Sequence, residues 1–361
     1  MTFTSADRDF MRRALALAGR GLFTTTPNPR VGCVVVRDGT IVGEGFHERA
    51  GEAHAEVSAL RAAGDRAAGA TVYVNLEPCN HHGRTPPCVD TLLAAEVERV
   101  VVAMGDPNPK VSGRGFAALR AAGIAVDAGL LEDEARELNV GFTSRMTRGR
   151  PWVRLKVAAS LDAKTALASG ESRWITGAEA RRDGHRWRAR ACAILTGIGT
   201  VRDDDPQLTV REVETPRQPL RVLVDSRLEV PLTARILEGG NVLVAAAVDD
   251  RARIERLRER GAEVVVLPNA SGKVELAELV RELGRRALNE VHVEAGFRLN
   301  GSLVAAGVVD ELLVYLAPKV LGETGRGMFH LPAIERLADA RRLSLVDVAQ
   351  PGDDVRLRLR F

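Results

Sequence analysis

The chain has 361 residues, of which 45% are hydrophobic and 27% are charged. This length exceeds what one hydrophobic core usually organises, so we expect two domains, and the composition excludes a disordered or low-complexity protein. Four cysteines are too few for a disulfide scaffold. The sequence shows no apolar run of membrane-helix length, and residues 1–9 lack a signal-sequence pattern. We therefore expect a cytoplasmic protein.

The net charge of +3 is spread over the chain, and residues 1–150 carry 18 basic and 18 acidic residues. A nucleic-acid binder usually concentrates its basic residues, because contacts with phosphates supply most of its affinity. The one basic cluster, residues 181–190, is explained equally well as a solvated helix face. We expect small-molecule substrates and neither a nucleic acid nor a membrane as partner. We also expect a homo-oligomer.

Helical and strand patterns alternate through the first half. Asp38-Gly39, a dipeptide typical of tight hairpins, separates predicted strands at 31–37 and 40–43, and Ser5 can cap the first helix. Alternating units favour an α/β sandwich with a largely parallel sheet and the hairpin at its edge. The other predicted elements are helices at about 5–19, 54–63, 88–95, 115–122 and 132–145 and strands at 71–75, 99–104 and near 124.

Residues 147–151 form the best candidate linker, because Gly and Pro lie there between a finished helix and a new apolar strand at 152–159. We predict domains at residues 1–148 and 151–361. The second half repeats the alternation of helices and strands. Its predicted strands are 193–197, 220–225, 241–247, 263–267, 290–294 and 311–317, and its predicted helices are about 178–189, 250–260, 274–287 and 299–306.

One imidazole, one carboxylate and two thiols occur in order at His54, Glu56, Cys79 and Cys88. One His and two Cys ligands leave the fourth tetrahedral position of zinc to a water, whose pKa the metal lowers toward neutrality. Glu56 can converge with His54 only in the first turn of a helix, where it would move protons rather than bind zinc. This ordered pattern is the signature of zinc nucleobase deaminases.

The spacing of the cysteines departs from that signature, which has two residues between them, whereas residues 80–87 intervene here. His81 and His82 lie in this insertion and are alternatives to Cys88 as the third ligand. We favour Cys88, because the insertion has the composition of a rigid polar loop. Its residues His81, His82, Arg84 and Thr85 are typical of a site for an anionic group.

The second half lacks Gly-x-Gly-x-x-Gly, so a dinucleotide cannot bind there in a Rossmann site. The segment 294–302 follows a predicted strand and opens a helix. Backbone N–H groups and the positive end of a helix dipole could hold a pyrophosphate at that point. A simple turn explains these glycines as well, so the pattern alone leaves both interpretations open.

Longer motifs connect these features. In the first half they are Thr26-Pro27-Asn28-Pro29, His54-Ala-Glu56 and Glu77-Pro78-Cys79-x-His81-His82-Gly83-Arg84-Thr85-Pro86-Pro87-Cys88. In the second half they are Lys156, Ser160-Leu-Asp162, Ser172-x-Trp174-Ile-Thr176, Thr200-Val-x-x-Asp204-Asp-Pro206, Val293-Glu294-Ala-Gly296 and Ala317-Pro318-Lys319. With these motifs, essentially the whole chain resembles the bifunctional riboflavin biosynthesis deaminase/reductases.

The resemblance implies a fold and two activities. It implies an α/β protein with a cytidine-deaminase-like zinc domain followed by a dihydrofolate-reductase-like NADPH domain. The first domain would bind one zinc per chain and deaminate a diaminohydroxyphosphoribosylaminopyrimidine, with Glu56 shuttling the proton and Asn28 contacting the substrate. The second would use NADPH to reduce the ribosyl side chain to ribityl. Hydride transfer needs no protein nucleophile, because the cofactor carries that chemistry.

The resemblance also assigns residues of the second domain. Substrate contacts are implied for Ser172, Arg188, Leu208, Arg211 and Glu294, and the forked guanidinium groups suit a phosphate. Lys156 and Asp204 are candidates for polarising or proton-handling groups, and Ser226 with Arg227 could read the extra phosphate of NADPH. The implied cofactor contacts are Ala158, Trp174, Thr200, Asp204, Ser226, Gly296, Phe297, Arg298, Leu299, Asn300, Gly301 and Ser302.

Two other functions share the zinc pattern. A nucleic-acid editing deaminase with an accessory domain would need a basic rim and stacking aromatic residues, whereas aromatic residues make up only 4% of this chain. A zinc-stabilised binding module would need a fourth protein ligand, which His81 or His82 could provide.

Overall fold

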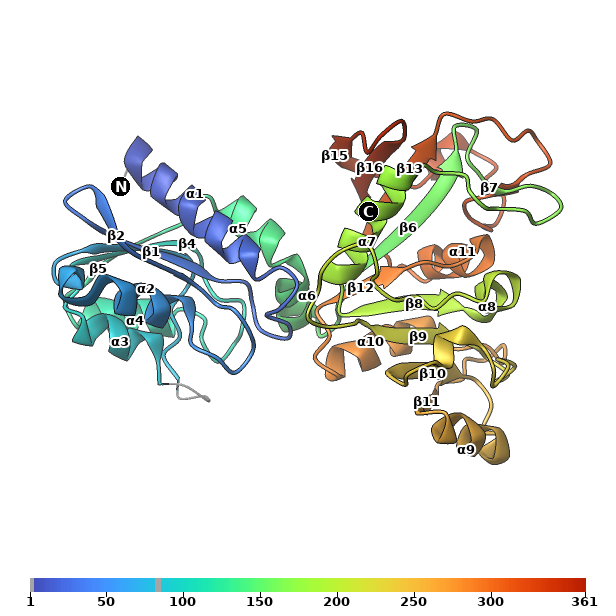
Figure 1. Ribbon diagram of the computed structural model, residues 1–361, viewed down its shortest axis with the longest axis horizontal. Coiled ribbons are helices and arrows are strands. Elements are labelled where there is room, and N and C mark those ends of the chain that lie inside the picture. Colours follow the sequence, from blue (N-terminus) through green and yellow to red (C-terminus); the bar gives the residue numbers. More distant parts are fainter. Residues whose placement is uncertain (1–2, 82–85) are drawn as a thin grey trace. The chain divides into compact units, whose positions relative to one another are not determined.

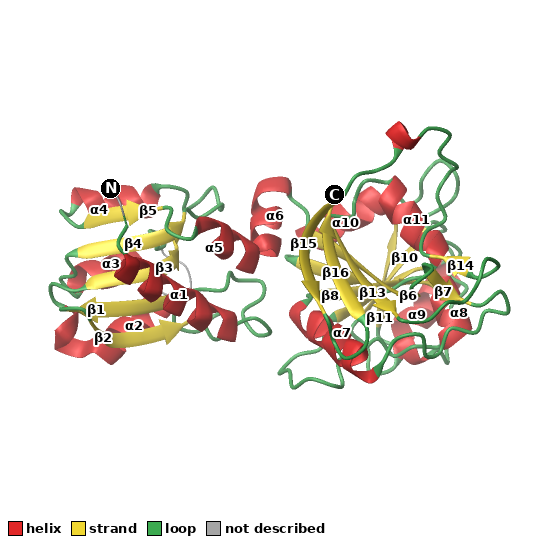
Figure 2. Ribbon diagram, turned by 90° about the horizontal axis from the view of Figure 1, so that it is seen from above, coloured by secondary structure: helices red, strands yellow, loops and turns green. Residues whose placement is uncertain are grey.

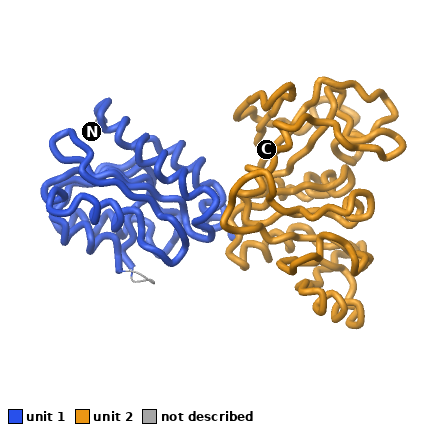
Figure 3. Tube along the Cα trace, in the orientation of Figure 1, with its two compact units in different colours: residues 1–149 blue, residues 150–361 orange. Residues whose placement is uncertain are grey.

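The computed structural model describes residues 3–81 and 86–361. It divides into two compact units, residues 1–149 and 150–361 (Figure 3). Among the described residues, none of the helices has the length and apolar character that crossing a membrane requires.

The first unit is built on a five-stranded sheet with the strand order β2-β1-β3-β4-β5, which Figure 2 shows side by side. The strands are β1 (Gly32–Arg37), β2 (Thr40–Phe46), β3 (Thr71–Leu76), β4 (Arg99–Met104) and β5 (Ala125–Ala128). The predicted hairpin lies at the edge. Because β1 runs against both of its neighbours, while β3, β4 and β5 pair in parallel, the sheet is mixed rather than largely parallel.

Helices cover both faces of this sheet (Figure 1). Apolar residues such as Leu60, Leu92 and Leu119 pack α2, α3 and α4 on one face, and Met11 and Leu17 pack α1 on the other face together with α5. The result is a three-layer α/β/α unit. Its helices are α1 (Ser5–Arg20), α2 (Ala55–Ala63), α3 (Cys88–Ala94), α4 (Arg114–Ala121), α5 (Glu132–Leu138) and α6 (Val140–Arg148).

Two glycines of β2 bring helix α2 directly onto the strand. A Cβ at Gly43 would lie 2.2 Å from the carbonyl oxygen of Ala59, and one at Gly45 would lie 2.6 Å from that of Ala55. No side chain fits at either position, so the backbone of the helix rests on the backbone of the strand. This contact fixes where the first turn of α2 stands relative to the sheet.

The structure corrects two predicted helix boundaries. The cap of α1 is Thr4 rather than Ser5, because Thr4 and Asp7 form a reciprocal capping box. The helix predicted at 132–145 is two helices, α5 and α6, separated at Asn139. The buried Asn139 side chain accepts from the Arg30 backbone N–H (2.8 Å) and donates to the Arg30 carbonyl (2.9 Å), and this long-range contact takes precedence over helix continuity.

The second unit contains a nine-stranded sheet with the order β11-β10-β9-β8-β12-β6-β13-β16-β15. Seven strands, from β11 to β13 in that order, pair in parallel, and β16 and β15 add an antiparallel edge. The strands are β6 (Trp152–Ser160), β8 (Ala193–Gly197), β9 (Leu220–Val224), β10 (Val242–Ala246), β11 (Ala262–Val266), β12 (Glu290–Val293), β13 (Glu311–Ala317), β15 (Ser344–Ala349) and β16 (Val355–Arg360), and a separate small sheet pairs β7 (Lys164–Ala166) with β14 (Arg326–Gly327).

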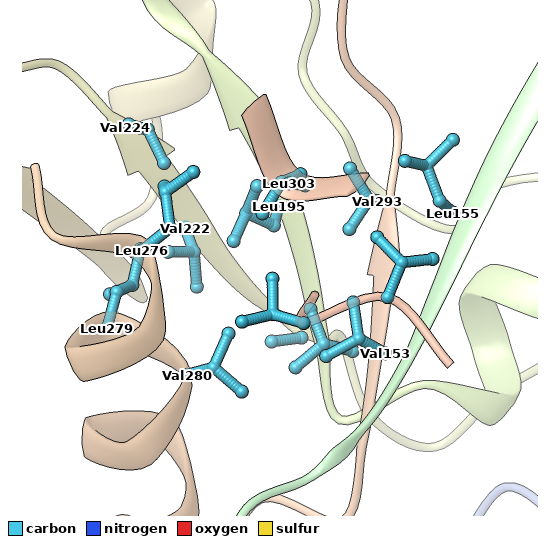
Figure 4. Packing of buried hydrophobic residues seen from close by; sticks show 14 of the residues in the cluster. Val153, Leu155, Leu195, Val222, Val224, Leu276, Leu279, Val280, Val293 and Leu303 are labelled. Atoms are coloured by element: carbon cyan, nitrogen blue, oxygen red, sulfur yellow. The ribbon is translucent and has the colours of Figure 1, made fainter. Parts of the chain in front are cut away.

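The main core of this unit lies between the sheet and two helices. Val153, Val222 and Val293 of the strands lie in one cluster with Leu279 of α10 and Leu303 of α11 (Figure 4). Neighbouring positions point to the opposite face, where α7 and α9 pack. The helices are α7 (Ala178–Arg190), α8 (Ile198–Asp204), α9 (Arg251–Glu259), α10 (Leu276–Arg285) and α11 (Phe297–Ala305).

The sequence prediction missed several elements of the second unit. It omitted α8, the small sheet and the antiparallel edge strands β15 and β16, and it placed the start of α11 at residue 299 instead of Phe297. Residues 355–360 alternate Val or Leu with Arg, a period-two pattern that does signal a strand. Helix α8 is only one or two turns long, which leaves little periodicity to detect.

Candidate active sites

Three zinc-type ligands meet in the first unit. The Nδ1 atom of His54 lies 3.1 Å from the sulfur of Cys88 and 3.6 Å from that of Cys79, and all three ligand atoms are within 4.8 Å of one another. His54 precedes the first residue of α2, Cys79 follows β3, and Cys88 begins α3. Two sulfurs and one imidazole nitrogen suit tetrahedral zinc and leave one position open. The side chains therefore fit the metal.

The two cysteines shift each other's pKa in opposite directions. A hydrogen bond from Cys88 lowers the pKa of Cys79 to about 4, and the hydrogen bond with His54 acts in the same direction. The Cys88 pKa is correspondingly raised by its bond to Cys79 and by burial. One thiolate thus forms readily, as metal binding requires.

Glu56 lies beside this cluster in the first turn of α2, as predicted. It is only 3% exposed, and its burial raises the pKa of its carboxyl group. The carboxylate is not one of the clustered ligand atoms. A buried carboxyl group beside a metal site, with its pKa raised above the usual value, is placed to accept a proton and to return it.

A second histidine, which the sequence analysis did not single out, supports the site. The buried His47 donates from Nδ1 to the Ala53 carbonyl (3.0 Å), so its Nε2 accepts from the Asn28 side chain (3.0 Å). Its ring meets the ring of His54 edge-on, with the centroids 5.5 Å apart. Asn28 is thereby held close to the metal ligands, which is where a substrate contact must lie.

Glu77 has a structural role that its position next to Cys79 did not reveal. Its two carboxylate oxygens accept four backbone N–H groups, those of Asp106, Gly113, Gly115 and Phe116, at 2.9–3.3 Å. These bonds tie the loop after β4 to the loop that carries Cys79. The carboxylate charge of Glu77 is compensated by these backbone N–H donors, so Glu77 does not act as a zinc ligand.

The insertion between the cysteines is only partly described. His81 is exposed and is not a member of the ligand cluster, so the structure favours Cys88 over His81 as the third ligand. The residues His82, Arg84 and Thr85, for which we also predicted a role, lie outside the described residues.

In the second unit, the carboxyl ends of the parallel strands open into a cavity of about 1710 Å³. Ligands of open α/β sheets bind at this edge. The predicted residues that line the cavity are Lys156, Ala158, Ser172, Trp174, Arg188, Thr200, Asp204, Leu208, Arg211, Ser226, Glu294, Gly296, Phe297, Arg298, Leu299, Asn300 and Ser302.

Gly301 is the one predicted contact of this unit that does not line the cavity. A Cβ at this position would lie 1.9 Å from the His330 carbonyl oxygen. The need for glycine at position 301 is therefore explained by the close packing of α11 against the backbone at His330. The segment 296–302 places its other residues along the cavity.

Glu294 organises the charges at the centre of the cavity. Arg188 donates hydrogen bonds to both carboxylate oxygens of Glu294. Lys156 Nζ lies 3.9 Å from Oε2 of Glu294, and His292 Nε2 lies 3.4 Å from Oε1. Burial by itself would raise the pKa of Glu294, but Arg188 and Lys156 outweigh it and lower that pKa well below its usual value. Burial also lowers the pKa of Lys156. The carboxylate stays ionised, and the charge of Arg188 is already paired.

The start of α11 fits the phosphates of a dinucleotide. Gly296, the residue before the helix, has no side chain that could cap the N–H groups of the first turn, and this turn lines the cavity. A Cβ at Gly296 would meet only the Thr200 hydroxyl, at 3.8 Å, so there is open space in front of the helix end. Uncapped N–H groups at a helix N-terminus favour an anion. The site therefore suits NADPH without a Rossmann motif.

Comparison with known proteins agrees with both sites. Residues 4–104 match the cytidine and deoxycytidylate deaminase zinc-binding region, and residues 151–357 match the RibD C-terminal domain. The riboflavin biosynthesis protein RibD of Escherichia coli is 50% identical over 98% of this chain and 99% of its own length. The chain belongs to the RibD family. The Haemophilus influenzae RibD is 47% identical over 99% of this chain and 98% of its own length.

Solved RibD structures have the same architecture. Acinetobacter baumannii RibD, form 1, superposes with a TM-score of 0.90 at 46% identity, and the Thermotoga maritima diaminohydroxyphosphoribosylaminopyrimidine deaminase/5-amino-6-(5-phosphoribosylamino)uracil reductase with 0.87 at 34% identity. Each comparison covers 98% of both chains. The predicted fold is confirmed: a cytidine-deaminase-like domain precedes a RibD reductase domain.

Membership of the RibD family makes this chain a bifunctional deaminase and reductase of riboflavin biosynthesis. Zinc belongs to its deaminase domain and NADPH to its reductase domain. An editing deaminase with an accessory domain is not favoured, because the match extends over both halves of the chain. The substrates of this family are small molecules rather than nucleic acids.

Proposed function

We propose that the first unit deaminates a diaminohydroxyphosphoribosylaminopyrimidine and that the second reduces the resulting 5-amino-6-(5-phosphoribosylamino)uracil with NADPH. The observation that carries this proposal is the presence of both sites in one chain, a His-Cys-Cys cluster beside a buried Glu and a large cavity with an uncapped helix end. The T. maritima protein named for these two reactions matches 98% of the chain. The proposed catalytic domains are residues 1–148 and 151–361.

In the deaminase, His54, Cys79 and Cys88 hold the metal through one nitrogen and two sulfurs. Bound zinc supplies a Lewis acid that makes a water nucleophilic at neutral pH. Glu56 would take one proton from the attacking water and give it to a ring nitrogen, and would then carry the second proton of that water to the amino group, which leaves as ammonia. Asn28, oriented by His47, contacts the pyrimidine.

The same proposal gives the insertion between the cysteines a substrate role. His81, together with His82, Arg84 and Thr85 outside the described residues, binds the phosphate of the substrate. Imidazole, guanidinium and hydroxyl groups all donate hydrogen bonds to phosphate oxygens. His81 is exposed, as a group that awaits a ligand must be.

In the reductase, residues 296–302 would hold the phosphates of NADPH, and the rest of the cofactor would be held by Trp174, Thr200, Asp204, Ala158 and Ser226, which line the same cavity. Lys156 stands on β6 with a lowered pKa and handles the proton that accompanies reduction of the sugar. Ser172, Leu208, Arg211, Arg188 and Glu294 bind the substrate, with Arg188 acting through its pair with Glu294. The remaining parts of this proposal are a homo-oligomeric assembly and a cytoplasmic location.

The deciding experiment follows the two reactions separately. The purified protein is incubated with the phosphoribosylaminopyrimidine, with and without NADPH, while ammonia release and NADPH oxidation are recorded. We expect ammonia under both conditions and NADPH oxidation only after deamination. Ammonia release without any later NADPH oxidation would refute the reductase assignment, and absence of both would refute the proposal as a whole.

A further inference from the structure

A histidine of the reductase cavity, His185, has no role in anything described so far. It lies on α7 one turn before Arg188, lines the cavity and is 8% exposed. In the sequence it stands among arginines on a helix that could equally have been a solvated face. Burial at a cavity wall is unusual for such a residue unless its ring nitrogens are used.

One nitrogen of this ring is used by the protein. The Nδ1 atom of His185 accepts the backbone N–H of Arg211 at 3.2 Å. In a neutral imidazole the proton then resides on Nε2, which makes Nε2 a donor. Among the described residues Nε2 has no hydrogen-bond partner, and His185 borders the cavity. The donor is therefore available to a ligand.

The charges around this donor favour an anion. Lys156, Arg188, Arg211 and Glu294 act on His185, which makes three cations against one carboxylate. Arg188 is paired with Glu294, whereas Arg211 has no carboxylate within ion-pair distance among the described residues, and its guanidinium donates to the Thr209 hydroxyl (3.0 Å). Burial, together with Arg188 and Arg211, lowers the pKa of His185 to about 4, so the ring is neutral at physiological pH.

We propose that His185 contacts the substrate and donates its Nε2–H to the phosphate of the phosphoribosyl group beside Arg211. The inference rests on the proposed reductase function and deepens it. Arg211 supplies charge, and His185 supplies a fixed, neutral donor whose direction is set by the bond to the Arg211 backbone. The same bond couples the donor to the loop that carries Arg211, so the phosphate meets both groups together.

Two substitutions separate substrate contact from loop anchoring. In His185→Asn the amide oxygen can replace Nδ1 as acceptor for Arg211, but no donor reaches the Nε2 position. In His185→Gln the longer side chain returns an N–H donor near the Nε2 position and loses the acceptor near Cα. The probe is ribose 5-phosphate, which carries the recognised group, titrated calorimetrically into the zinc-loaded full chain. Because the insertion between the cysteines is proposed to bind the same group, the reductase site is the component of the titration that Arg211→Ala removes.

We expect His185→Asn to weaken ribose 5-phosphate about tenfold or more, since the lost hydrogen bond involves a charged acceptor. His185→Gln should retain most of the affinity, and both variants should keep wild-type NADPH affinity, zinc content and deamination. In steady-state reduction, KM for the aminouracil substrate should rise in His185→Asn by a similar factor, with kcat nearly unchanged.

The opposite pattern overturns the inference. If His185→Asn binds ribose 5-phosphate like the wild type, or if His185→Gln is the more damaged variant, His185 only anchors the loop. A wild-type protein that binds ribose 5-phosphate but never reduces the aminouracil would refute the proposed reductase function instead, and the calorimetric comparison would still decide the role of His185.

Discussion

The two sites occupy the same kind of place and are built in different ways. Both lie at the carboxyl edge of strands that run side by side, where polar groups from several connections converge. The deaminase site takes its ligands from two helix starts and one strand end, and their donor atoms lie within 4.8 Å of one another. The reductase site spreads over a cavity of about 1710 Å³ lined from Lys156 to Arg326.

The difference follows from what each site must hold. A metal ion has short, fixed bonds, so its ligands must be packed together before it arrives. A dinucleotide and a sugar phosphate are large and flexible, and many weak contacts along a wide surface hold them. Single substitutions should therefore affect the first site far more than the second, and the following experiments test that contrast.

Glu56→Gln should have the largest effect. General acid/base catalysis contributes about 10²- to 10⁴-fold, and an amide cannot carry the proton, so deamination should fall by that factor. Zinc content and reduction of the already deaminated substrate should remain unchanged. Ammonia release and metal analysis measure both, and the exposed Glu52→Gln is the matched control. Loss of reduction as well would show that the two sites are not independent.

Cys88→Ser should have the second largest effect, which is the loss of most of the bound zinc. A hydroxyl is a much poorer zinc ligand than a thiolate, and the remaining thiolate and imidazole cannot complete the site. Metal analysis of the purified variant measures this, and His81→Ala is the comparison. If Cys88→Ser kept its zinc while His81→Ala lost it, the ligand assignment would be wrong.

The contrast between the sites also explains what the sequence could reveal. Zinc ligation depends on three residue types in order, so this order indicated His54 and Cys79 and left Cys88 as the favoured third ligand over His81 and His82. The reductase contacts are spread from Lys156 to Ser302, and residues such as Thr200 and Leu208 carry no chemistry that spacing could identify. They were found through resemblance to a family. The structure then brings them to one cavity.

Residues that support the sites were the hardest to predict. His47 acts through hydrogen bonds to Asn28 and Ala53, and His185 through one to the Arg211 backbone. Glu77 acts through bonds to backbone groups 29 to 39 positions away. Such contacts depend on how elements pack, which residue type does not encode. The break at Asn139 has the same origin, since its partner Arg30 lies at the other end of the unit's sequence.

Gly296→Val tests the cofactor site. The open space in front of α11 accepts a side chain without disturbing the fold, because the nearest atom to an added Cβ is 3.8 Å away. That side chain would occupy the place of a phosphate at the helix end. We expect NADPH affinity to fall about tenfold or more, equivalent to ~1.4 kcal/mol.

Fluorescence titration of NADPH measures this effect, with zinc content and ammonia release unchanged. Gly327→Val is the matched control, because an added Cβ there also meets nothing within 4 Å and Gly327 does not line the cavity. Equal NADPH affinity in Gly296→Val and the wild type would remove the helix end from the cofactor site.

The smallest effect should come from Arg227→Ala, which tests recognition of the extra phosphate of NADPH. Arg227 is 66% exposed and pairs with Glu229 at 3.1 Å, so binding a phosphate must compete with that pair and with water. Ser226 beside it accepts the Val274 N–H at 3.2 Å and keeps its own hydroxyl proton to donate. We expect NADPH affinity to fall less than about tenfold, which is under ~1.4 kcal/mol, and NADH affinity to stay constant.

A parallel loss of affinity for both cofactors would show that Arg227 does not bind this phosphate. If Arg227→Ala changed neither the NADPH nor the NADH affinity, Ser226→Ala would be the decisive variant. Several neighbouring residues of a wide cavity can each bind one phosphate, so the loss of one of them is partly compensated. The ligands of a metal ion cannot compensate for one another in this way.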